Sequence, residues 1–215
     1  MRRWTAMGAM LLVAAGCSGV QETAQTDDGW IPLFDGQSLN GWRASENPAT
    51  FRVENGVIVV HGPRAHLYYD GPVGNHDFRN FEWKAEILTF PQANSGMYFH
   101  TEFQETGWPA KGYEVQVNNS HSDPRRTGSL YAIDDVNEML VPDGEWFTQH
   151  VIVEGKRVRI LVNERQVVDY TEPASTDRPN DMAGRVVSSG TVALQGHDPN
   201  SQVHYRNIMF RLLPE

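Results

Sequence analysis

The sequence predicts an all-β fold, a two-sheet antiparallel β-sandwich of jelly-roll type that forms a single domain over residues 29–215. Apolar residues alternate with polar ones at period two over most of the chain, with almost no helical periodicity. Turn signals separate strand-sized segments about every ten residues, the spacing typical of a sandwich. The length of 215 residues suits one large all-β domain, and 40% hydrophobic against 21% charged residues allows a packed core.

The first strands are predicted around a hairpin turn. Asn55-Gly56 lies between the apolar segments 51–53 and 57–60, and this dipeptide is the strongest short hairpin signal. The next segment, 81–87, alternates strictly: its odd-numbered residues are apolar, and its even-numbered residues are Glu or Lys. We therefore expect one face of this strand to be buried in the core and the other to be polar.

Three later segments alternate in the same way. Residues 97–100, 113–117 and 157–162 each place apolar side chains on one face. The other face carries polar side chains, except for Leu161 in the last segment. Residues 172–189 form the longest stretch without clear alternation, which predicts a surface loop.

Charge and cysteine content exclude several classes of protein. Lys and Arg total 18 against 27 Asp and Glu, a net charge of −9, and an acidic chain is poorly suited to bind the phosphates of nucleic acid. The single cysteine rules out an intrachain disulfide and a multi-cysteine metal site. The sequence has no Gly-rich phosphate loop, no Gly-x-Ser-x-Gly motif and no alternating helices of a dinucleotide fold. We expect neither a nucleic acid nor a nucleotide partner.

The first residues resemble the signal of a bacterial lipoprotein. Two early arginines precede an apolar segment, 6–15, that is too short to span a bilayer, and Cys17 follows three small residues. The resemblance implies a signal peptide over 1–16, acylation of Cys17 and a flexible tether over 17–28. We expect an exported protein anchored in a lipid bilayer through Cys17, at the outer membrane or cell surface or on the periplasmic side. The alternative is an ordinary secretory signal with an incidental cysteine.

The polar faces of the predicted strands indicate a surface for a ligand. Several of them carry Glu, Gln, His or Arg on the non-core side, with Trp and Tyr close by. On a curved sheet such a face is typical of a sugar groove, because aromatic rings stack on C–H faces while carboxylates and amides pair with hydroxyls. The alternative interpretation is a plain solvated sheet face.

Several motifs occur in an order that is similar to one protein family. They are WIPLFDG at 30–36 with LNGW at 39–42, NSGMYF at 94–99, GYEVQV at 112–117, TGSLY at 127–131, and LQGH at 194–197 with YRNI at 205–208. Together they resemble the 3-keto-disaccharide hydrolase domain family, long described as a domain of unknown function, over residues 30–212. Its concanavalin-like jelly roll agrees with the fold predicted above. His100, Asn118 and Trp146-Phe147 depart from the family pattern.

The resemblance implies a hydrolase that cleaves 3-keto-glycosides such as 3-keto-disaccharides. The C3 ketone acidifies the C2 proton, a base removes that proton, the enolate expels the glycosidic oxygen at C1, and water adds to the double bond. This lyase–hydratase route needs a general base and a group that stabilises the enolate, and it differs from the two-carboxylate route of ordinary glycosidases. The alternative is a non-catalytic carbohydrate-binding module of the cell envelope, since one fold hosts both functions.

Strand facing, residue type and the resemblance together select the candidate site residues. Glu114 and His197 are candidate catalytic groups for proton transfer, and Arg206 is the candidate for stabilising the enolate. We expect these side chains to share one hollow with the predicted substrate-binding residues. The oxygen and nitrogen donors permit a divalent cation such as Ca²⁺ as cofactor, although no compact ligand spacing demands one. The predicted substrate-binding residues are Glu86, Asn94, His100, Trp108, Gln116, Tyr131 and Gln195.

Overall fold

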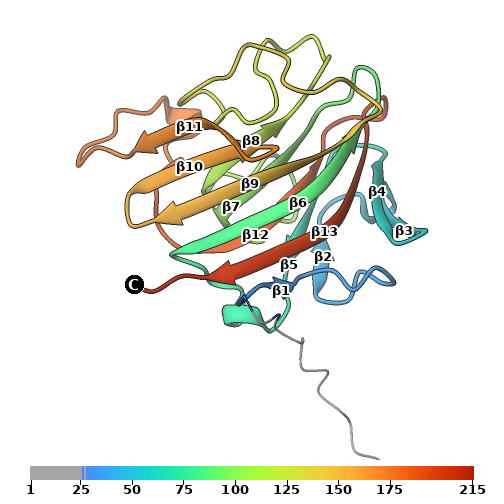
Figure 1. Ribbon diagram of the computed structural model, residues 1–215, viewed down its shortest axis with the longest axis horizontal. Coiled ribbons are helices and arrows are strands. Elements are labelled where there is room, and N and C mark those ends of the chain that lie inside the picture. Colours follow the sequence, from blue (N-terminus) through green and yellow to red (C-terminus); the bar gives the residue numbers. More distant parts are fainter. Residues whose placement is uncertain (1–25, 27) are drawn as a thin grey trace, which may run out of the picture.

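Two antiparallel β-sheets pack face to face in the computed structural model, which describes residue 26 and residues 28–215 (Figure 1). Three short 3-10 helices lie between the strands: η1 (Pro48–Thr50), η2 (Val73–His76) and η3 (Asn180–Met182). The larger sheet contains β1 (Ile31–Pro32), β3 (Phe51–Glu54), β4 (Val57–His61), β6 (Phe81–Thr89), β9 (Trp146–Glu154), β10 (Arg157–Val162), β11 (Arg165–Thr171) and β13 (Gln202–Leu212). The smaller sheet contains β2 (Trp42–Ala44), β5 (Ala65–Tyr69), β7 (Ser95–Thr101), β8 (Tyr113–Val117) and β12 (Thr191–Gly196).

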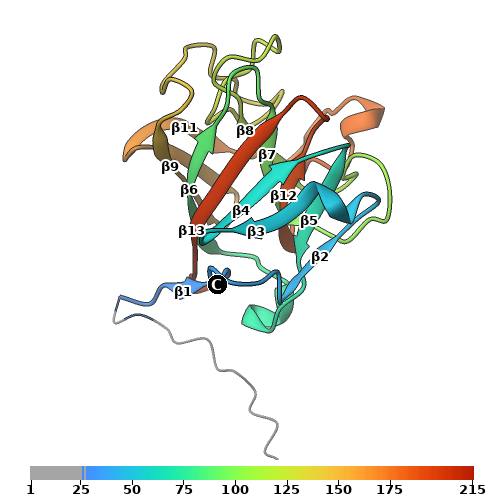
Figure 2. The same cartoon turned by 90° about the vertical axis from the view of Figure 1, so that its right-hand side faces the viewer.

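Neighbouring strands in each sheet come from distant parts of the chain. The larger sheet has the order β11-β10-β9-β6-β13-β4-β3, with β1 beside β13, and the smaller sheet has the order β2-β5-β12-β7-β8. All of these pairings are antiparallel, and Figures 1 and 2 show the two layers from two sides. The prediction of an all-β, two-sheet antiparallel jelly roll is confirmed.

The hairpin between β3 and β4 forms at the predicted dipeptide. Asn55 has φ +51° and Gly56 has φ +81°, so both residues adopt the left-handed conformation that a two-residue turn of this type requires. Asn163 and Glu164, with φ +48° and +67°, make the same kind of turn between β10 and β11.

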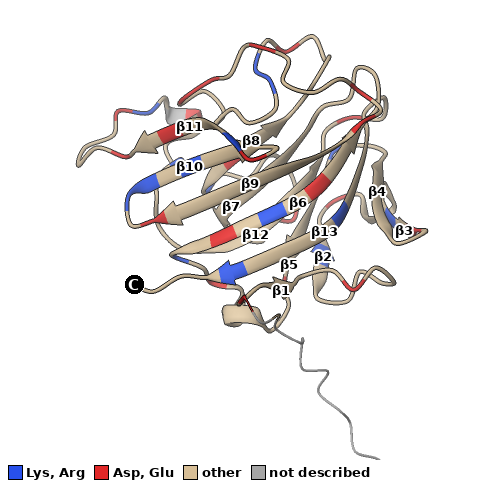
Figure 3. Ribbon diagram, viewed as in Figure 1, with Lys and Arg blue, Asp and Glu red and all other residues tan. Residues whose placement is uncertain are grey.

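The core lies between the two sheets, and β6 shows how the alternating sequence builds it. Phe81, Trp83, Ala85 and Ile87 are fully buried, as their shared face predicts. The even-numbered residues of β6 are partly exposed on the outer face of the larger sheet, where acidic and basic positions alternate along the strand (Figure 3).

The smaller sheet is buried on both of its faces along four of its strands. Every residue of β5, β7, β8 and β12 is buried, including the carboxyl and amide side chains that point away from the core. Loops 102–112, 118–145 and 172–190 lie against this sheet and shield its outer face. Polar groups on that face therefore sit in a sheltered environment instead of open solvent.

The segment 172–189 contains no strand, as predicted, but it packs closely against the smaller sheet. Glu172 accepts a hydrogen bond from the hydroxyl of Tyr113 at 2.6 Å. Arg178 donates to the hydroxyls of Tyr113 and Tyr170, at 3.1 and 2.7 Å. The loop is thereby fastened to β8 and β11, and residues near its end are held above the sheet.

The predicted signal peptide over 1–16, Cys17 and most of the tether over 17–28 lie outside the described residues. Thr26 is described, and its hydroxyl donates to the carbonyl of Trp30 at 2.9 Å. In the part of the chain that the structure describes, no helix is long and apolar enough to cross a membrane.

Gly112 joins two loops beside the smaller sheet and allows a test of this packing. Its N–H donates to the carbonyl of Gly184 at 2.9 Å, its φ is +86°, and a Cβ added there would lie 2.2 Å from the carbonyl oxygen of Phe99. We expect Gly112→Ala to lower the free energy of unfolding by more than about 2 kcal/mol in urea unfolding, because strain and a backbone clash add. Gly144→Ala is the matched control, since Gly144 has φ +82° but nothing within 4 Å, and it should cost only about 1 kcal/mol. Equal losses in the two variants would contradict the importance of the close contact.

Candidate functional site

A hollow of about 430 Å³ lies on the outer face of the smaller sheet. Strands β7, β8 and β12 form its floor, and the loops that shield the sheet form its walls. Side chains from distant parts of the chain therefore converge there. Seven of the residues selected from the sequence line the hollow: Asn94, Trp108, Glu114, Gln116, Tyr131, Gln195 and His197.

The register of the smaller sheet brings the polar groups of the floor together. Tyr98 in β7 lies directly opposite Glu114 in β8. Gln116 shares its strand face with Glu114, and Gln195 in β12 reaches the same carboxylate from the other side of β7. A Cβ on Gly96 would lie 2.7 Å from Glu114 Oε1, so glycine at this position leaves room for the carboxylate.

Glu114 is a buried carboxyl group surrounded by donors. The Tyr98 hydroxyl donates to its Oε2 at 2.8 Å, Gln195 Nε2 donates to its Oε1 at 3.0 Å, and Arg185 Nη2 lies 3.7 Å from Oε2. The Gln116 amide, in the orientation that satisfies its neighbours, also donates to Oε1 at 3.2 Å. Burial raises the pKa of Glu114 above its ordinary value, although the charge of Arg185 and these hydrogen bonds oppose the shift. The group is thus suited to exchange a proton closer to neutral pH.

Arg185 is the cation of the hollow, and sequence analysis did not select it. Its Nη1 donates to the carbonyl of Tyr131 at 2.9 Å, and its guanidinium lies 5.0 Å from the centre of the Tyr131 ring. It comes from the aperiodic segment 172–189, where no alternation indicates which way a side chain faces. The guanidinium in the hollow is therefore that of Arg185, and not that of Arg206 as predicted.

His197 follows β12 directly and is oriented by its neighbour. Its Nδ1 lies 2.8 Å from Asp198 Oδ2, and Asp198 also accepts from the Ser201 hydroxyl at 2.7 Å. Burial acts to raise the pKa of Asp198, but the hydrogen bonds from Ser201 and His197 outweigh it and lower the pKa below its ordinary value. An ionised Asp198 favours the tautomer with the proton on Nδ1, which leaves Nε2 with a free lone pair. The centre of the imidazole ring lies 5.2 Å from the centre of the Trp108 ring, and Trp108 is 45% exposed.

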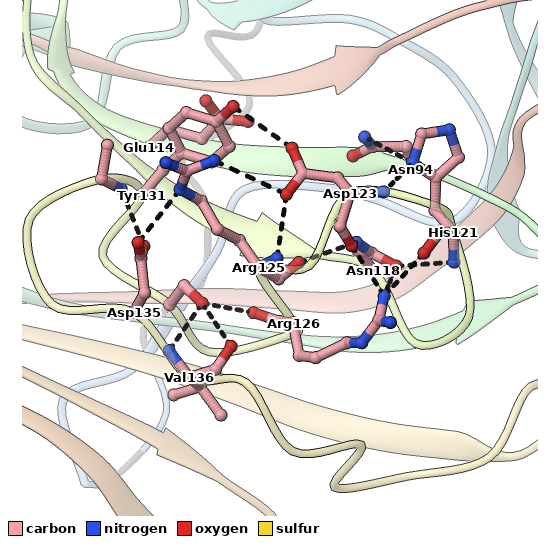
Figure 4. A network of polar contacts seen from close by, with 12 residues as sticks. Asn94, Glu114, Asn118, His121, Asp123, Arg125, Arg126, Tyr131, Asp135 and Val136 are labelled. Carbon is pink, nitrogen blue, oxygen red and sulfur yellow. Dashed lines mark hydrogen bonds and ion pairs between the residues drawn. The ribbon is translucent and has the colours of Figure 1, made fainter.

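Asn118 organises the loop that carries two further residues of the hollow (Figure 4). Its amide nitrogen donates to the carbonyls of Asp123 and Arg125, at 3.0 and 2.7 Å, and its Oδ1 accepts from the N–H of His121 at 2.8 Å. The Tyr131 hydroxyl donates to the Asp123 carboxylate at 3.3 Å, and both side chains line the hollow. An aspartate at position 118 could not make the two donations, so the amide of Asn118 has a structural role in the wall.

Arg206 and Glu86 lie on the other sheet, and the prediction that they share the hollow is wrong. Arg206 Nε in β13 donates to Glu86 Oε2 in β6 at 2.8 Å, and its guanidinium lies 3.9 Å from the centre of the Trp146 ring. Asn207 donates to the other carboxylate oxygen at 2.6 Å. Strands β6 and β13 pair within the larger sheet. Alternation identifies the residues that share a strand face, but it does not identify the sheet that a strand joins.

His100 also lies away from the hollow, which corrects its predicted place there. Its φ of +53° interrupts the alternation of β7, at the point where the pairing with β12 changes register. The ring is fully buried: Nε2 lies 2.9 Å from the carbonyl of Arg79, and Nδ1 accepts from the N–H of Ser188 at 3.2 Å. Burial lowers the pKa of His100 to about 4, so the ring is neutral at pH 7. It ties two loops together within the protein.

The hollow contains donors of the kind that a divalent cation takes. Glu114, Asp123 and His197 all line it. Within the described residues, however, no three His, Cys, Asp or Glu side chains are grouped closely enough to hold a metal ion. The expectation of a cation such as Ca²⁺ stays a prediction.

Comparison with known proteins assigns the chain to a family. The family model of the 3-keto-alpha-glucoside-1,2-lyase-like domain matches residues 29–211, which is most of the chain. The protein belongs to this family. The resemblance that the sequence motifs indicated is thereby confirmed.

Relatives of known name or structure agree with this assignment. A 3-keto-disaccharide hydrolase of Bacteroides thetaiotaomicron is 28% identical over 170 residues, which cover 66% of this chain and 59% of that protein. The chain thus spans about three fifths of the length of that curated relative. A Parabacteroides distasonis protein of known structure, provisionally named a glycosyl hydrolase, has a TM-score of 0.74 at 23% identity over 89% of this chain and 99% of its own.

A carbohydrate-binding module from Bacillus subtilis, CBM66, has a TM-score of 0.57 at 12% identity, over 80% of this chain and 95% of that module. Likenesses at such low identity show the shared fold alone. This chain and a carbohydrate-binding module therefore share one architecture, so the fold alone does not distinguish catalysis from sugar binding.

The buried carboxyl of Glu114 gives a prediction about stability and pH. Because its pKa is raised in the folded protein, its ionised form is disfavoured there, and the parent loses stability as the pH rises from below 4.5 through the raised pKa. We expect Glu114→Gln to melt above the parent at about pH 8, with a difference that shrinks as the pH falls toward about 4. Thermal unfolding over this range measures it, with the exposed Glu145→Gln as control. A difference that grows toward low pH would have the wrong sign.

Proposed function

We propose that this protein cleaves 3-keto-glycosides, among them 3-keto-disaccharides, in the hollow of the smaller sheet. The observation that carries the proposal is the convergence of Glu114, Arg185 and the His197–Asp198 pair on one sheltered hollow. Family membership and a relative named 3-keto-disaccharide hydrolase support it. A base, a cation and a carboxyl with a raised pKa are the groups that elimination beside a ketone requires.

His197 removes the C2 proton of the sugar in this proposal. Asp198 holds the Nδ1 proton of the imidazole, so Nε2 is the atom that accepts. The electron pair of the C2–H bond forms a double bond between C2 and C3, and the C3 oxygen becomes an enolate. The guanidinium of Arg185 stabilises the negative charge on that oxygen.

Glu114 protonates the leaving group and then accepts a proton from the water. As the enolate returns to a ketone, the bond from C1 to the glycosidic oxygen breaks, a double bond forms between C1 and C2, and protonated Glu114 gives its proton to the leaving oxygen. Water then adds: its hydroxyl joins C1, its second proton returns to Glu114, and His197 returns a proton to C2. One water is consumed, two sugars are released, and both side chains regain their starting states.

The remaining residues of the hollow bind the sugar in this proposal. The rings of Trp108 and Tyr131 offer faces for the C–H side of a sugar ring, and the amides of Asn94, Gln116 and Gln195 offer donors and acceptors for its hydroxyls. Placing the reacting C2 atom beside His197 is the main contribution of these groups.

Substitution of the proposed catalytic residues tests the reaction. We expect His197→Ala to lower kcat/KM for a 3-keto-disaccharide about 10²- to 10⁴-fold, because a general base is lost. We expect Arg185→Leu to lower it about 10²- to 10³-fold, because the enolate loses its cation. Sugar release followed by chromatography measures both effects. Arg206→Leu, which removes a cation from the other sheet, should leave the rate within about twofold.

A loss in Arg206→Leu as large as in Arg185→Leu would contradict this assignment of the site. Tight binding of unoxidised glycans without turnover of any 3-keto-glycoside would instead identify a carbohydrate-binding module. The assay is repeated after treatment with EDTA and again with added Ca²⁺. A rate that disappears with the chelator and returns with the ion would add a divalent cation to the proposal.

We also propose that the protein is exported and anchored to a bilayer by an acylated Cys17, on the support of the N-terminal pattern alone. In bacteria given radiolabelled palmitate, we expect the full chain to take up label and to fractionate with membranes. Cys17→Ser should lose both properties, because the acceptor thiol is gone. Equal labelling of the two proteins, or recovery of the parent in the soluble fraction, would contradict the anchor.

A further inference from the structure

A second hollow, of about 470 Å³, lies at the opposite end of the smaller sheet from the first. Arg43 in β2, Tyr68 in β5, Thr101 at the end of β7 and Thr191 at the start of β12 line it. Along β12, Thr191 lies four residues before Gln195 of the first hollow, or about 13 Å away. The reaction proposed above uses none of the residues that line this second hollow.

The two hollows share one face of the sheet and are separated by an aromatic wall. In the strand register Arg43 lies opposite Tyr68, Tyr68 opposite Ala193, and Ala193 opposite Tyr98, so these side chains project from the same face. Tyr68, Ala193 and Tyr98 pack with Phe103 in a cluster that is separate from the main core.

Thr101 supplies a buried hydroxyl that has no partner. Its side chain is 1% exposed, and Oγ1 makes no hydrogen bond to any described residue. The nearby Tyr68 hydroxyl is buried as well and makes no hydrogen bond of normal geometry, although the backbone of Gln104 lies close to it. Leaving such groups unpaired is unfavourable, and their position on the lining of a hollow indicates a ligand that pairs with them.

The rim of the second hollow carries charges of both signs over aromatic surface. The guanidinium of Arg43 lies 3.5 Å from the centre of the Phe103 ring and forms no ion pair with any described residue. Lys111 lies 3.4 Å from the Glu102 carboxylate, and two aspartates also line the hollow. Two cations and three carboxylates give no excess of positive charge, so the hollow does not select an anion such as phosphate.

We propose that this second hollow is a binding site for a neutral saccharide. Aromatic rings provide surface for the C–H face of a sugar, and the mixed donors and acceptors suit its hydroxyls. The volume is in the range of small-ligand sites. The sugar needs no ketone to bind here, so the protein holds an unoxidised saccharide at this end of the sheet and carries out its chemistry at the other.

Titration of the isotope-labelled full-length protein with maltotriose, cellotriose and xylotriose, followed by NMR, tests this site. With at least one of these neutral probes we expect the backbone amide signals of Glu102 and Thr191 to shift at millimolar concentration. Thr101→Val keeps the shape of the side chain and should weaken binding about tenfold, because one hydrogen bond to the sugar is lost. Its melting temperature should equal or exceed that of the parent, because the hydroxyl has no partner within the protein.

Thr171→Val is the matched control, since Thr171 is an exposed threonine on β11 in the larger sheet. Its affinity for the probe should equal that of the parent. The site is disproved by the absence of shifts with all three probes, by shifts confined to the first hollow, or by unchanged affinity in Thr101→Val. A Thr101→Val protein that melts well below the parent also overturns the proposal, because the hydroxyl then has a structural partner. The probes carry no ketone, so failure here and failure of the proposed reaction are separate results.

Discussion

A carboxylate buried against the outer face of a β-sheet needs hydrogen-bond donors and a compensating charge, and the need of Glu114 for them shapes the whole site. Tyr98 supplies a donor from the neighbouring strand β7, Gln195 supplies one from β12 on the far side of β7, and Arg185 supplies the charge from a distant loop. Gly96 leaves the space that the carboxylate occupies. The floor of the hollow and the loop above it are therefore coupled, because each satisfies a polar group that the other buries.

Sheet and loops contribute differently to the site. Backbone hydrogen bonding between the strands fixes the positions of the glutamine amides and the Glu114 carboxyl on the floor of the first hollow. The loops then bring groups that no strand carries: Arg185, the Trp108 ring, and the Asp123–Tyr131 pair whose loop is built around Asn118. A β-sandwich that carries its functional groups partly on loops can support either catalysis or plain sugar binding. The second hollow lies at the far end of the same face, and strands and loops likewise both contribute to its lining.

Local patterns predict the all-β character, several of the strands and the groups that share a single strand, but not the assembly of the site. Glu114 and Gln116 were correctly placed on one face because the period of two is a property of the strand itself. Arg206 was misplaced because strand order depends on contacts between distant segments, which alternation does not encode. His100 left its expected face because the backbone adopts a left-handed conformation there, unusual for a histidine. Arg185 was missed because its segment has no periodicity from which to infer a direction.

The proposed reaction begins when His197, in the first hollow, removes the C2 proton of a 3-keto-glycoside, and hydrogen exchange measures that step directly. A 3-keto-disaccharide is cleaved in D₂O, and the released keto sugar is analysed by NMR during the first turnovers. Because the proton on a protonated imidazole exchanges with solvent, we expect deuterium at C2 of the product, its loss in His197→Ala, and its retention in Arg206→Leu. Product formed at the full rate without deuterium at C2 would contradict the proposed mechanism, since the glycosidic bond would then break with the C2–H bond intact.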